Sequence, residues 1–283
     1  MKKASIVIPT FNKLNRLRLV LKSLESQVND DVEVIVVFDG CDPEVIEGFN
    51  ALNLSFKPTA VISEQNIGRA RARNKGIEAA TGEIVIFLDD DRVVSPTYIE
   101  SHYALHKEKG FGVVLGQRNQ LFMKDSDIDR FYEDSTGLRE FCETNGEVER
   151  YGYGHGAKSR IRWMNFYTGN VSVDRQALLD VGGFDEAFSK WGHEDLDLGI
   201  RLYLKGLTFG YSKVANNYHL MHASNFDNKK KQCAENMRYL VKKYKKQHLD
   251  IRLLLTYLYT KQSIFGVRVS KSQLRKFEML SQE

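Results

Sequence analysis

Three consecutive carboxylates follow a hydrophobic run in the first third of the chain. The apolar residues 84–88 precede Asp89, Asp90 and Asp91. Packing like charges together raises the free energy unless a cation neutralises them. An oxygen-preferring divalent ion such as Mg²⁺ or Mn²⁺ would do this and could also hold a diphosphate. The triplet alone is equally compatible with a solvated acidic turn before the next helix.

A second acidic cluster lies in the sequence Trp191-Gly192-His193-Glu194-Asp195. The pattern predicts that a helix begins at the carboxylate pair. The helix dipole favours ionised carboxylates at this end, which suits a general base. The alternative is an ordinary acidic helix start beside a tryptophan of the core.

Two histidines, His219 and His222, are three residues apart. In a turn or an irregular segment, this spacing can bring two imidazoles to one metal ion. The alternative is one packed histidine beside a solvated one. The chain has only 7 histidines, and the acidic triplet already calls for metal ligands, so the pair is a candidate metal site.

Three arginines, Arg69, Arg71 and Arg73, alternate at the start of a predicted helix over residues 68–80. Helix N-termini bind anions, and guanidinium groups hold phosphates in bidentate pairs. An exposed basic face of a helix would give the same pattern.

The elements that must position these residues alternate between strand and helix through the first half of the chain. Apolar runs and helical spacing predict strands at 4–8, 33–38, 59–63, 83–88 and 112–116, and helices at 14–28, 43–52, 68–80 and 96–109, with Ser95 capping the last helix. Such alternation predicts a parallel sheet with flanking helices. Ligands bind at the carboxyl ends of parallel strands, where Thr10-Phe11-Asn12, Asp39-Gly40 and the acidic triplet all fall.

The second half is less regular in its pattern. Residues 119–162 are polar, charged and without a clear period, which predicts a long excursion or a mobile lid over the site. Beyond it we expect strands at 169–173 and 207–211 and helices at 175–181 and 194–205. Two basic amphipathic helices are expected at 228–247 and 249–260.

Composition gives the chain an ordinary globular character. Its 283 residues are 42% hydrophobic and 28% charged, which excludes disordered, collagen-like and coiled-coil proteins. Three scattered cysteines favour neither a zinc ribbon nor a disulfide scaffold, and we expect a cytoplasmic protein. Lysines and arginines exceed acids by 14 to 5 from residue 225 onward, whereas acids exceed them by 32 to 27 before it. A basic tail therefore follows a mildly acidic body.

Taken together and in order, these motifs resemble the family 2 glycosyltransferases with the GT-A fold. The landmarks are Ser5-Ile-Val-Ile-Pro9-Thr10-Phe11-Asn12, Val36-Val-Phe-Asp39-Gly40, the segment Asn66 to Gly76, and Phe87-Leu-Asp89-Asp90-Asp91. The segment from Thr168-Gly169-Asn170 through Glu194-Asp195 resembles the catalytic portion of β-galactosyltransferases and polypeptide N-acetylgalactosaminyltransferases. The resemblance covers about residues 1–224 and implies an α/β, Rossmann-like, mostly parallel sheet there. The charge count and the helical patterns make residues 225–283 a basic helical extension.

The resemblance also implies roles for individual residues. Asp195 would be the catalytic base, and Glu194 would hold the donor sugar or the acceptor. Asp91, His219 and His222 would bind Mn²⁺ or Mg²⁺. The donor-binding positions would be Pro9, Thr10, Phe11, Asn12, Asp39, Asn66, Gly68, Arg73, Asp89, Asp90, Gly169, Asn170, Trp191, Gly192 and His193. Phe11, Cys41 and His193 depart from the residues more usual there, and His193 leaves the donor sugar open.

The activity implied is an inverting, metal-dependent transfer of a hexose or N-acetylhexosamine from a UDP-sugar. The acceptor hydroxyl could belong to a glycan, a lipid-linked saccharide or a protein. One alternative is a sugar-phosphate nucleotidyltransferase, although no glycine-rich basic loop follows the first strand. Another is a non-enzymatic protein whose tail binds nucleic acid or anionic lipid. Of these uses of the tail, we expect peripheral contact with the inner membrane face or pairing into a homodimer rather than nucleic-acid binding.

Overall fold

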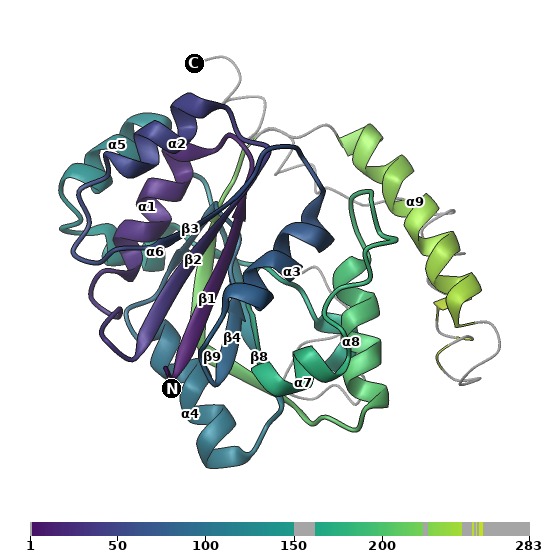
Figure 1. Cartoon of the computed structure of the whole chain (residues 1–283). Coiled ribbons are helices and arrows are strands. Elements are labelled where there is room, and N and C mark those ends of the chain that lie inside the picture. Colours follow the sequence, from purple (N-terminus) through teal and green to yellow (C-terminus); the bar gives the residue numbers. More distant parts are fainter. Residues whose placement is uncertain are drawn as a thin grey trace.

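One mixed sheet runs through the molecule (Figure 1). The protein is represented by a computed structural model that describes residues 2–149, 162–222 and 226–244, together with 251, 253, 255 and 256. Within these residues, nine strands form a single sheet in the order β3-β2-β1-β4-β8-β6-β9-β5, and β7 pairs with β6. The strands are β1 Ala4–Thr10, β2 Val32–Asp39, β3 Thr59–Ser63, β4 Ile84–Phe87, β5 Arg92–Val94, β6 Val113–Leu121, β7 Glu147–Val148, β8 Val171–Asp174 and β9 Phe209–Leu220.

Helices cover both faces of this sheet, with α1, α2 and α5 on one side and α3, α7 and α8 on the other (Figure 1). The helices are α1 Leu14–Leu24, α2 Pro43–Asn50, α3 Arg69–Ala79, α4 Tyr98–Lys109, α5 Asp125–Glu133, α6 Leu138–Asn145, α7 Arg175–Asp180, α8 Glu194–Leu204 and α9 Phe226–Lys243, with a short 3-10 helix at Arg162–Asn165.

The two faces of the central strands bury two separate cores. Val7, Val37 and Phe87 pack on the side of α3 and α8. Their neighbours Ile6 and Ile86 pack on the side of α1 and α4. Because successive side chains of a strand point to opposite faces, a strand covered on both sides must be apolar throughout. This explains why β1, β2 and β4 are nearly unbroken hydrophobic runs.

The parallel arrangement predicted for the first strands is confirmed, and the rest of the sheet is mixed. β3, β2, β1 and β4 are mutually parallel. β8 runs antiparallel to both β4 and β6, whereas β9 is parallel to β6. The carboxyl ends of β1, β2 and β4 therefore lie at one edge. This edge carries Thr10, Asp39 and the acidic triplet.

The segment 119–162 is more regular than expected. β6 continues to Leu121, and α5 and α6 follow it. α5 packs against α1 through ion pairs of Arg18 with Asp129 and of Arg16 with Asp125. Both helices are short and have few apolar residues, so they give little periodic signal. Residues 150–161 lie outside the described part, and the role of the segment as a lid stays a prediction.

Two local expectations were wrong. The strand expected at 207–211 extends to Leu220, because an irregularity in the pairing with β6 after Ser212 lets β9 resume its ladder at Asn216. Ser95 does not cap α4, which begins at Tyr98 after Thr97. The hydroxyl of Ser95 instead donates to the carbonyl of Val214.

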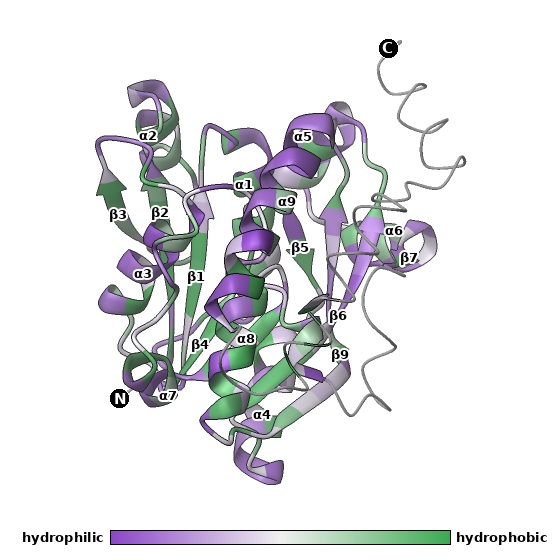
Figure 2. Cartoon of the chain, turned by 90° about the vertical axis from the view of Figure 1, so that its right-hand side faces the viewer, coloured by the Kyte–Doolittle hydropathy of each residue, from purple (hydrophilic) through white to green (hydrophobic). Residues whose placement is uncertain are grey.

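The first helix of the basic tail packs on the catalytic body. The hydroxyl of Tyr244 donates to Asp197 of α8 at 3.0 Å, and Lys243 forms an ion pair with the same carboxylate at 2.7 Å. Met237 and Leu240, on the inner side of α9, are fully buried. Figure 2 shows α9 over α8 with hydrophilic residues on its outer side. Contact of the tail with membrane or with a second copy stays a prediction, and the second tail helix falls mostly outside the described residues.

No helix in the described ranges combines the length and the apolar character needed to cross a bilayer.

Gly76 sets how closely α3 approaches the sheet. A Cβ at this position would lie 2.2 Å from Cγ1 of Val7. We expect Gly76→Val to lower the free energy of unfolding by about 1–3 kcal/mol, because the helix must move away from β1. Urea denaturation measures the change. Glu78→Val, on the exposed face of the same helix, is the matched control and should change stability by about 0.5 kcal/mol or less. Equal effects of the two changes would contradict the packing argument.

Candidate active site

Asp91 and two histidines form the only cluster of possible metal ligands found in the described residues. One ligand atom from each of Asp91, His219 and His222 lies within 4.8 Å of the other two. Nε2 of His222 is 3.2 Å from Oδ2 of Asp91, and Nε2 of His219 is 3.5 Å from the same oxygen. Burial raises the pKa of Asp91, but the charge of His219 and hydrogen bonds from both imidazoles outweigh it and hold the pKa well below its ordinary value.

Distant segments of the chain meet at this cluster because of the sheet topology. Asp91 follows β4, and Arg92 begins β5, which pairs antiparallel with β9 in a register that sets Arg92 against His219. The backbone N–H of Leu220 donates to the carbonyl of Asp91 at 2.8 Å. His222 then follows two residues after β9 ends. His219 thus lies near the end of a strand and His222 just beyond it, and this arrangement brings both imidazoles to Asp91 without a helix.

A buried arginine joins the acidic triplet to the second acidic cluster. The side chain of Arg73 is only 2% exposed. It donates from Nη1 to Glu194 Oε1 at 3.0 Å and from Nη2 to Asp89 Oδ1 at 3.2 Å. The other oxygen of Glu194, Oε2, is buried and has no hydrogen-bond partner within the described part of the chain. A buried carboxylate oxygen with an unused lone pair suits a ligand hydroxyl.

Asp195 has the properties of a base at neutral pH. Burial, with the charge of Glu194, raises the pKa of Asp195 to about 7, against the opposing effect of Arg73. Its Oδ1 accepts the N–H of Leu196 at 2.8 Å. The residue is only partly buried by surface area, so the second oxygen can reach a bound molecule. Asp195 and Glu194 open α8, as expected from their pattern.

The edge beside β2 is organised by Asp39. Its carboxylate accepts the backbone N–H groups of Ile67 at 2.6 Å and Gly68 at 3.1 Å, and its carbonyl accepts the amide of Asn66. Gly40 is required here, because a Cβ would lie 2.3 Å from the backbone nitrogen of Asn66. Asp39 therefore fixes the loop before α3.

The residues after β1 divide between structural and exposed roles. Thr10 is buried and donates to Asp90 Oδ2 at 2.8 Å. Asn12, at φ 52°, exchanges two hydrogen bonds with Asp42. Phe11 is 51% exposed, which leaves its ring open to stacking. Pro9 is partly buried, between the buried residues Ile8 and Thr10.

Asn170 is buried and links β6, β9 and α4 beside the site. It is 2% exposed, and its amide donates to the carbonyls of Gln117 and Ala215. Its Oδ1 pairs with His102 at 2.9 Å. Both amide hydrogens are thus used inside the core, and the expected place of Asn170 beside the sugar stays a prediction. Burial lowers the pKa of His102 to about 3, so this imidazole is neutral at ordinary pH.

Gly169 lets two charged side chains approach each other. A Cβ at Gly169 would lie 2.5 Å from Nε of Arg92 and 3.0 Å from Oδ2 of Asp89. These two groups form an ion pair at 3.8 Å. Packing alone thus explains why a glycine occupies position 169. Its expected role beside the donor stays a prediction.

α9 holds the loop that precedes α8. The amide of Asn236 donates to the carbonyl of Gly192 at 2.6 Å, and Gln232 accepts the N–H of Trp191 at 2.9 Å. Nε2 of His193 lies 3.0 Å from Sγ of Cys233. Trp191, Gly192 and His193 are therefore fixed by a helix whose sequence carries no motif for this task.

Sequence reasoning missed several charged residues of the site. Lys13 lies 2.8 Å from Asp91 and 3.3 Å from Asp90. Burial raises the pKa of Asp90 to about 6, although Lys13 opposes this. Arg92 pairs with Glu149, and two arginines near Glu149 overcome its burial and lower its pKa to about 2. Lys13 directly follows the Thr10–Asn12 motif and could have been noticed, whereas nothing around Glu149 signals a role.

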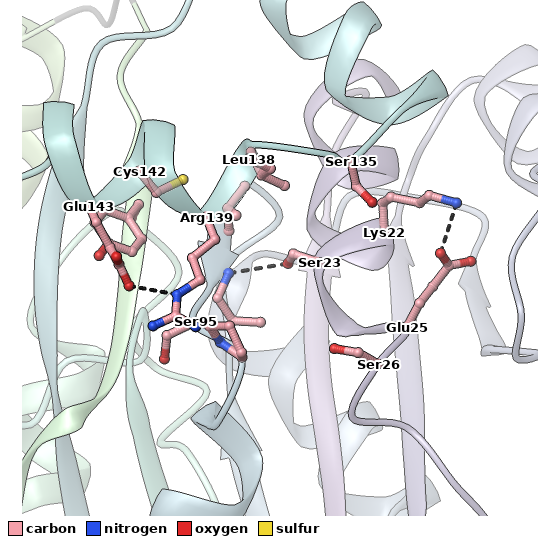
Figure 3. Close-up of a pocket in the computed structure, with 14 residues that line it drawn as sticks. Lys22, Ser23, Glu25, Ser26, Ser95, Ser135, Leu138, Arg139, Cys142 and Glu143 are labelled. Carbon is pink, nitrogen blue, oxygen red and sulfur yellow. Dashed lines mark hydrogen bonds and ion pairs between the residues drawn. The ribbon is translucent and has the colours of Figure 1, made fainter.

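A cavity of about 410 Å³ lies apart from these groups, between α1, β5 and α6 (Figure 3). Its lining includes Val93 and Tyr218, which alternate along their strands with the site residues Arg92 and His219. The cavity is thus on the opposite face of the β5–β9 pair.

Comparison with known sequences identifies the family. The profile described as Glycosyl transferase family 2 matches residues 5–178, and that of the N-terminal domain of galactosyltransferase matches residues 139–223. The chain belongs to glycosyl transferase family 2. The expected enzyme class is confirmed, and the nucleotidyltransferase and non-enzymatic alternatives are set aside.

Curated relatives carry similar descriptions. The chain is 28% identical to an uncharacterized glycosyltransferase, YfnE, of Bacillus subtilis, over 89% of this chain and 73% of that protein. It is 28% identical to validoxylamine A glucosyltransferase of Streptomyces hygroscopicus subsp. jinggangensis, over 98% and 68%. Escherichia coli chondroitin synthase is 30% identical over 76% of this chain but only 34% of the synthase.

Solved structures share the fold. Staphylococcus aureus TarS 1-349 in complex with UDP-GlcNAc has a TM-score of 0.65 at 16% identity, over 98% of this chain and 79% of that one. The mannosyltransferase PcManGT of Pyrobaculum calidifontis, in complex with GDP-Man and Mn²⁺, has a TM-score of 0.62 at 14% identity, over 98% and 73%. The GT-A fold expected from the motifs is confirmed.

Removal of Arg73 should strongly destabilise the fold. Arg73→Met would leave buried Glu194 without its cation, and we expect the free energy of unfolding to fall by about 3–5 kcal/mol. Urea denaturation of the single variant, of Glu194→Gln and of the double variant gives the coupling.

Arg71→Met is the control for that experiment, because Arg71 pairs with Glu186 while both side chains are about half exposed, at 53% and 50%. Its loss should change stability by about 1 kcal/mol or less. A similarly small loss for Arg73→Met would remove the argument that this residue holds the two acidic clusters together.

Proposed function

We propose that the enzyme transfers a hexose or N-acetylhexosamine from a UDP-sugar to a hydroxyl acceptor, with inversion at the anomeric carbon. The observation that carries the proposal is the connection of a partly exposed base, Asp195, to the Asp91–His219–His222 cluster. Asp195 is next to Glu194, which Arg73 joins to Asp89, two residues before Asp91. The proposed leaving-group site and proton acceptor thus lie close in sequence to two carboxylates that one buried arginine joins.

The donor set of the cluster fits a divalent cation. One carboxylate and two imidazoles suit Mn²⁺ better than Mg²⁺, since Mg²⁺ prefers oxygen ligands. Asp91, His219 and His222 would hold the ion. When bound, it would neutralise the negative charge that develops on the departing diphosphate. The complex of PcManGT with Mn²⁺ supports a metal on this fold.

The chain's own groups account for the proton and for the sugar. The acceptor oxygen forms a bond to the anomeric carbon while the bond from that carbon to the diphosphate oxygen breaks. The acceptor proton passes to Asp195, which acts as general base. Glu194 Oε2, buried and unpaired among the described groups, would accept a sugar or acceptor hydroxyl. A single displacement with one base inverts the configuration.

The nucleotide would lie along the carboxyl ends of β1 and β2. Asp39, buried at the end of β2, would accept the N–H of the uracil through a lone pair not used by Ile67 or Gly68, and the exposed ring of Phe11 would contact the base. The UDP-GlcNAc complex of TarS supports a UDP-linked donor. The acceptor hydroxyl would come from a glycan, a lipid-linked saccharide or a protein.

The rate should depend on pH through Asp195. Because its pKa is raised to about 7 and the base form is required, activity is lost as the pH falls through that value. At pH 6 we expect about one tenth of the plateau value of kcat, because about one tenth of the base is ionised. UDP release at saturating donor, acceptor and Mn²⁺ over pH 5.5–9 (roughly the range that brackets this group) measures it.

Asp195→Asn is the control for the pH profile. It should reduce kcat by about 10²- to 10⁴-fold and leave the residual rate without the step near pH 7. Binding of UDP to the variant should be unchanged. Turnover close to that of the unmodified enzyme would rule out this residue as the base.

Chelation should abolish transfer. After treatment with EDTA we expect UDP release from UDP-hexoses and UDP-N-acetylhexosamines to fall to background, and Mn²⁺ to restore it better than Mg²⁺. GDP-mannose in the same panel tests whether the enzyme requires a uridine nucleotide in the donor. His219→Ala with His222→Ala should weaken Mn²⁺ binding by about tenfold or more, since the ligands supply most of the affinity. Full activity in EDTA would exclude the metal.

A further inference from the structure

The ammonium group of Lys13 lies on the same atoms that a metal would use. Its Nζ is 2.8 Å from Oδ2 of Asp91 and 3.3 Å from Nε2 of His222. It is also 3.3 Å from Oδ1 of Asp90. Oδ2 of Asp91 is the very oxygen that both imidazoles approach. An internal cation thus holds two of the three groups assigned to the metal.

The lysine and a divalent ion cannot both keep these contacts. A small divalent cation binds oxygen ligands at about 2.1 Å and would draw Asp91 and His222 around itself. The ammonium donates a hydrogen bond to the Asp91 oxygen whose lone pair the ion needs, and two cations at one carboxylate repel each other. Binding of the ion therefore requires Nζ of Lys13 to leave.

Lys13 is free to make this movement, unlike the other cations around the acidic triplet. Its side chain is 31% exposed, whereas those of Arg73 and Arg92 are 2% and 7% exposed. The residue occupies the N-cap of α1, and its side chain forms no capping hydrogen bond. Four rotatable bonds link Nζ to the backbone, so displacement needs no change in the helix.

Two further cations, Lys229 of α9 and Arg69 at the start of α3, lie in the neighbourhood of Lys13. Lys229 of α9 is half-buried, and burial, Arg69 and Lys13 lower its pKa while Asp91 raises it. Arg69 is the first residue of α3, and Nζ of Lys229 lies 5.4 Å from the centre of the Trp191 ring, in the loop before α8. Three cations from the starts of α1 and α3 and from α9 would suit a diphosphate, with its several anionic oxygens.

We propose that Lys13 is a built-in competitor of the metal: it occupies Asp91 and His222 in the free enzyme, and the incoming ion displaces it onto the donor's diphosphate. The proposal rests on the metal site of the proposed function. It makes Lys13 a ligand-binding residue with opposite effects on two affinities. The side chain weakens binding of the metal alone and strengthens binding of the nucleotide once the metal is present.

Mn²⁺ titration of the nucleotide-free protein, followed by the electron paramagnetic resonance signal of free Mn²⁺, tests the first effect. If the ammonium occupies the site about nine tenths of the time, its removal should tighten the apparent Kd about tenfold. We therefore expect Lys13→Met to bind Mn²⁺ about tenfold more tightly than the unmodified chain. Lys13→Gln is the second variant in case the first folds poorly, and melting temperatures in EDTA check both.

Lys229→Met is the matched control, because it removes a neighbouring positive charge for which no contact with Asp91 is seen in the described residues. A general electrostatic effect would strengthen Mn²⁺ binding similarly in both variants, whereas displacement predicts a clearly larger gain for Lys13→Met. In saturating Mn²⁺, calorimetric titration with UDP should show weaker binding to Lys13→Met, by about three- to tenfold.

Three outcomes would overturn the inference: Mn²⁺ affinity that Lys13→Met leaves unchanged or weaker, an equal gain in Lys229→Met, or UDP affinity that does not fall. None of these outcomes would contradict the proposed metal site itself. That site fails only if the double variant His219→Ala, His222→Ala binds Mn²⁺ as well as the unmodified chain.

Discussion

The burial of one guanidinium group between two carboxylates is the constraint on which the site depends. Arg73 would be strongly destabilising inside the protein if either Asp89 or Glu194 moved away, because an unpaired buried charge loses its hydration without compensation. Glu194 is 121 residues from Arg73 along the chain. Asp89 follows the end of β4 and Glu194 begins α8. Their distance is therefore set by charge neutralisation as well as by packing. Asp195 receives its position through its neighbour.

Neighbouring acids of the same triplet acquire different properties from different cations. Asp89 lies between two arginines that outweigh its burial and lower its pKa. Asp90 accepts from Thr10, but burial still raises its pKa to about 6. Asp91 has imidazoles beside it and has a pKa well below the ordinary range. Three identical side chains thus differ in pKa because their neighbours and their burial differ, and only Asp91 lies where two imidazoles could share a metal ion with it.

The sequence predicts the parts of the fold whose signals are local. The apolar runs of β1, β2 and β4 and the polar residues at their ends were enough to locate the ligand edge, because both sheet faces are covered. The histidine pair could also be predicted, from its spacing together with the order of the motifs.

Other parts were not predictable because their cause is tertiary. Lys13 acts through Asp91, which is 78 residues away. Glu149 has meaning only beside Arg92 and Arg118. The amide of Asn170 donates to backbone carbonyls that β6 and β9 bring together, and no local motif indicates these contacts. The length of β9 was hidden by the pairing irregularity after Ser212, which interrupts the alternation of the strand.

The docking of α9 has a consequence for where the working unit ends. The family profiles stop at residue 223, yet Gln232, Cys233 and Asn236 hold the loop that leads into the catalytic pair. Homology alone would thus draw a border through the scaffold of the reaction centre. Substitutions on the inner side of this helix would therefore disturb the loop before Glu194 and Asp195 from a segment outside the matched profiles.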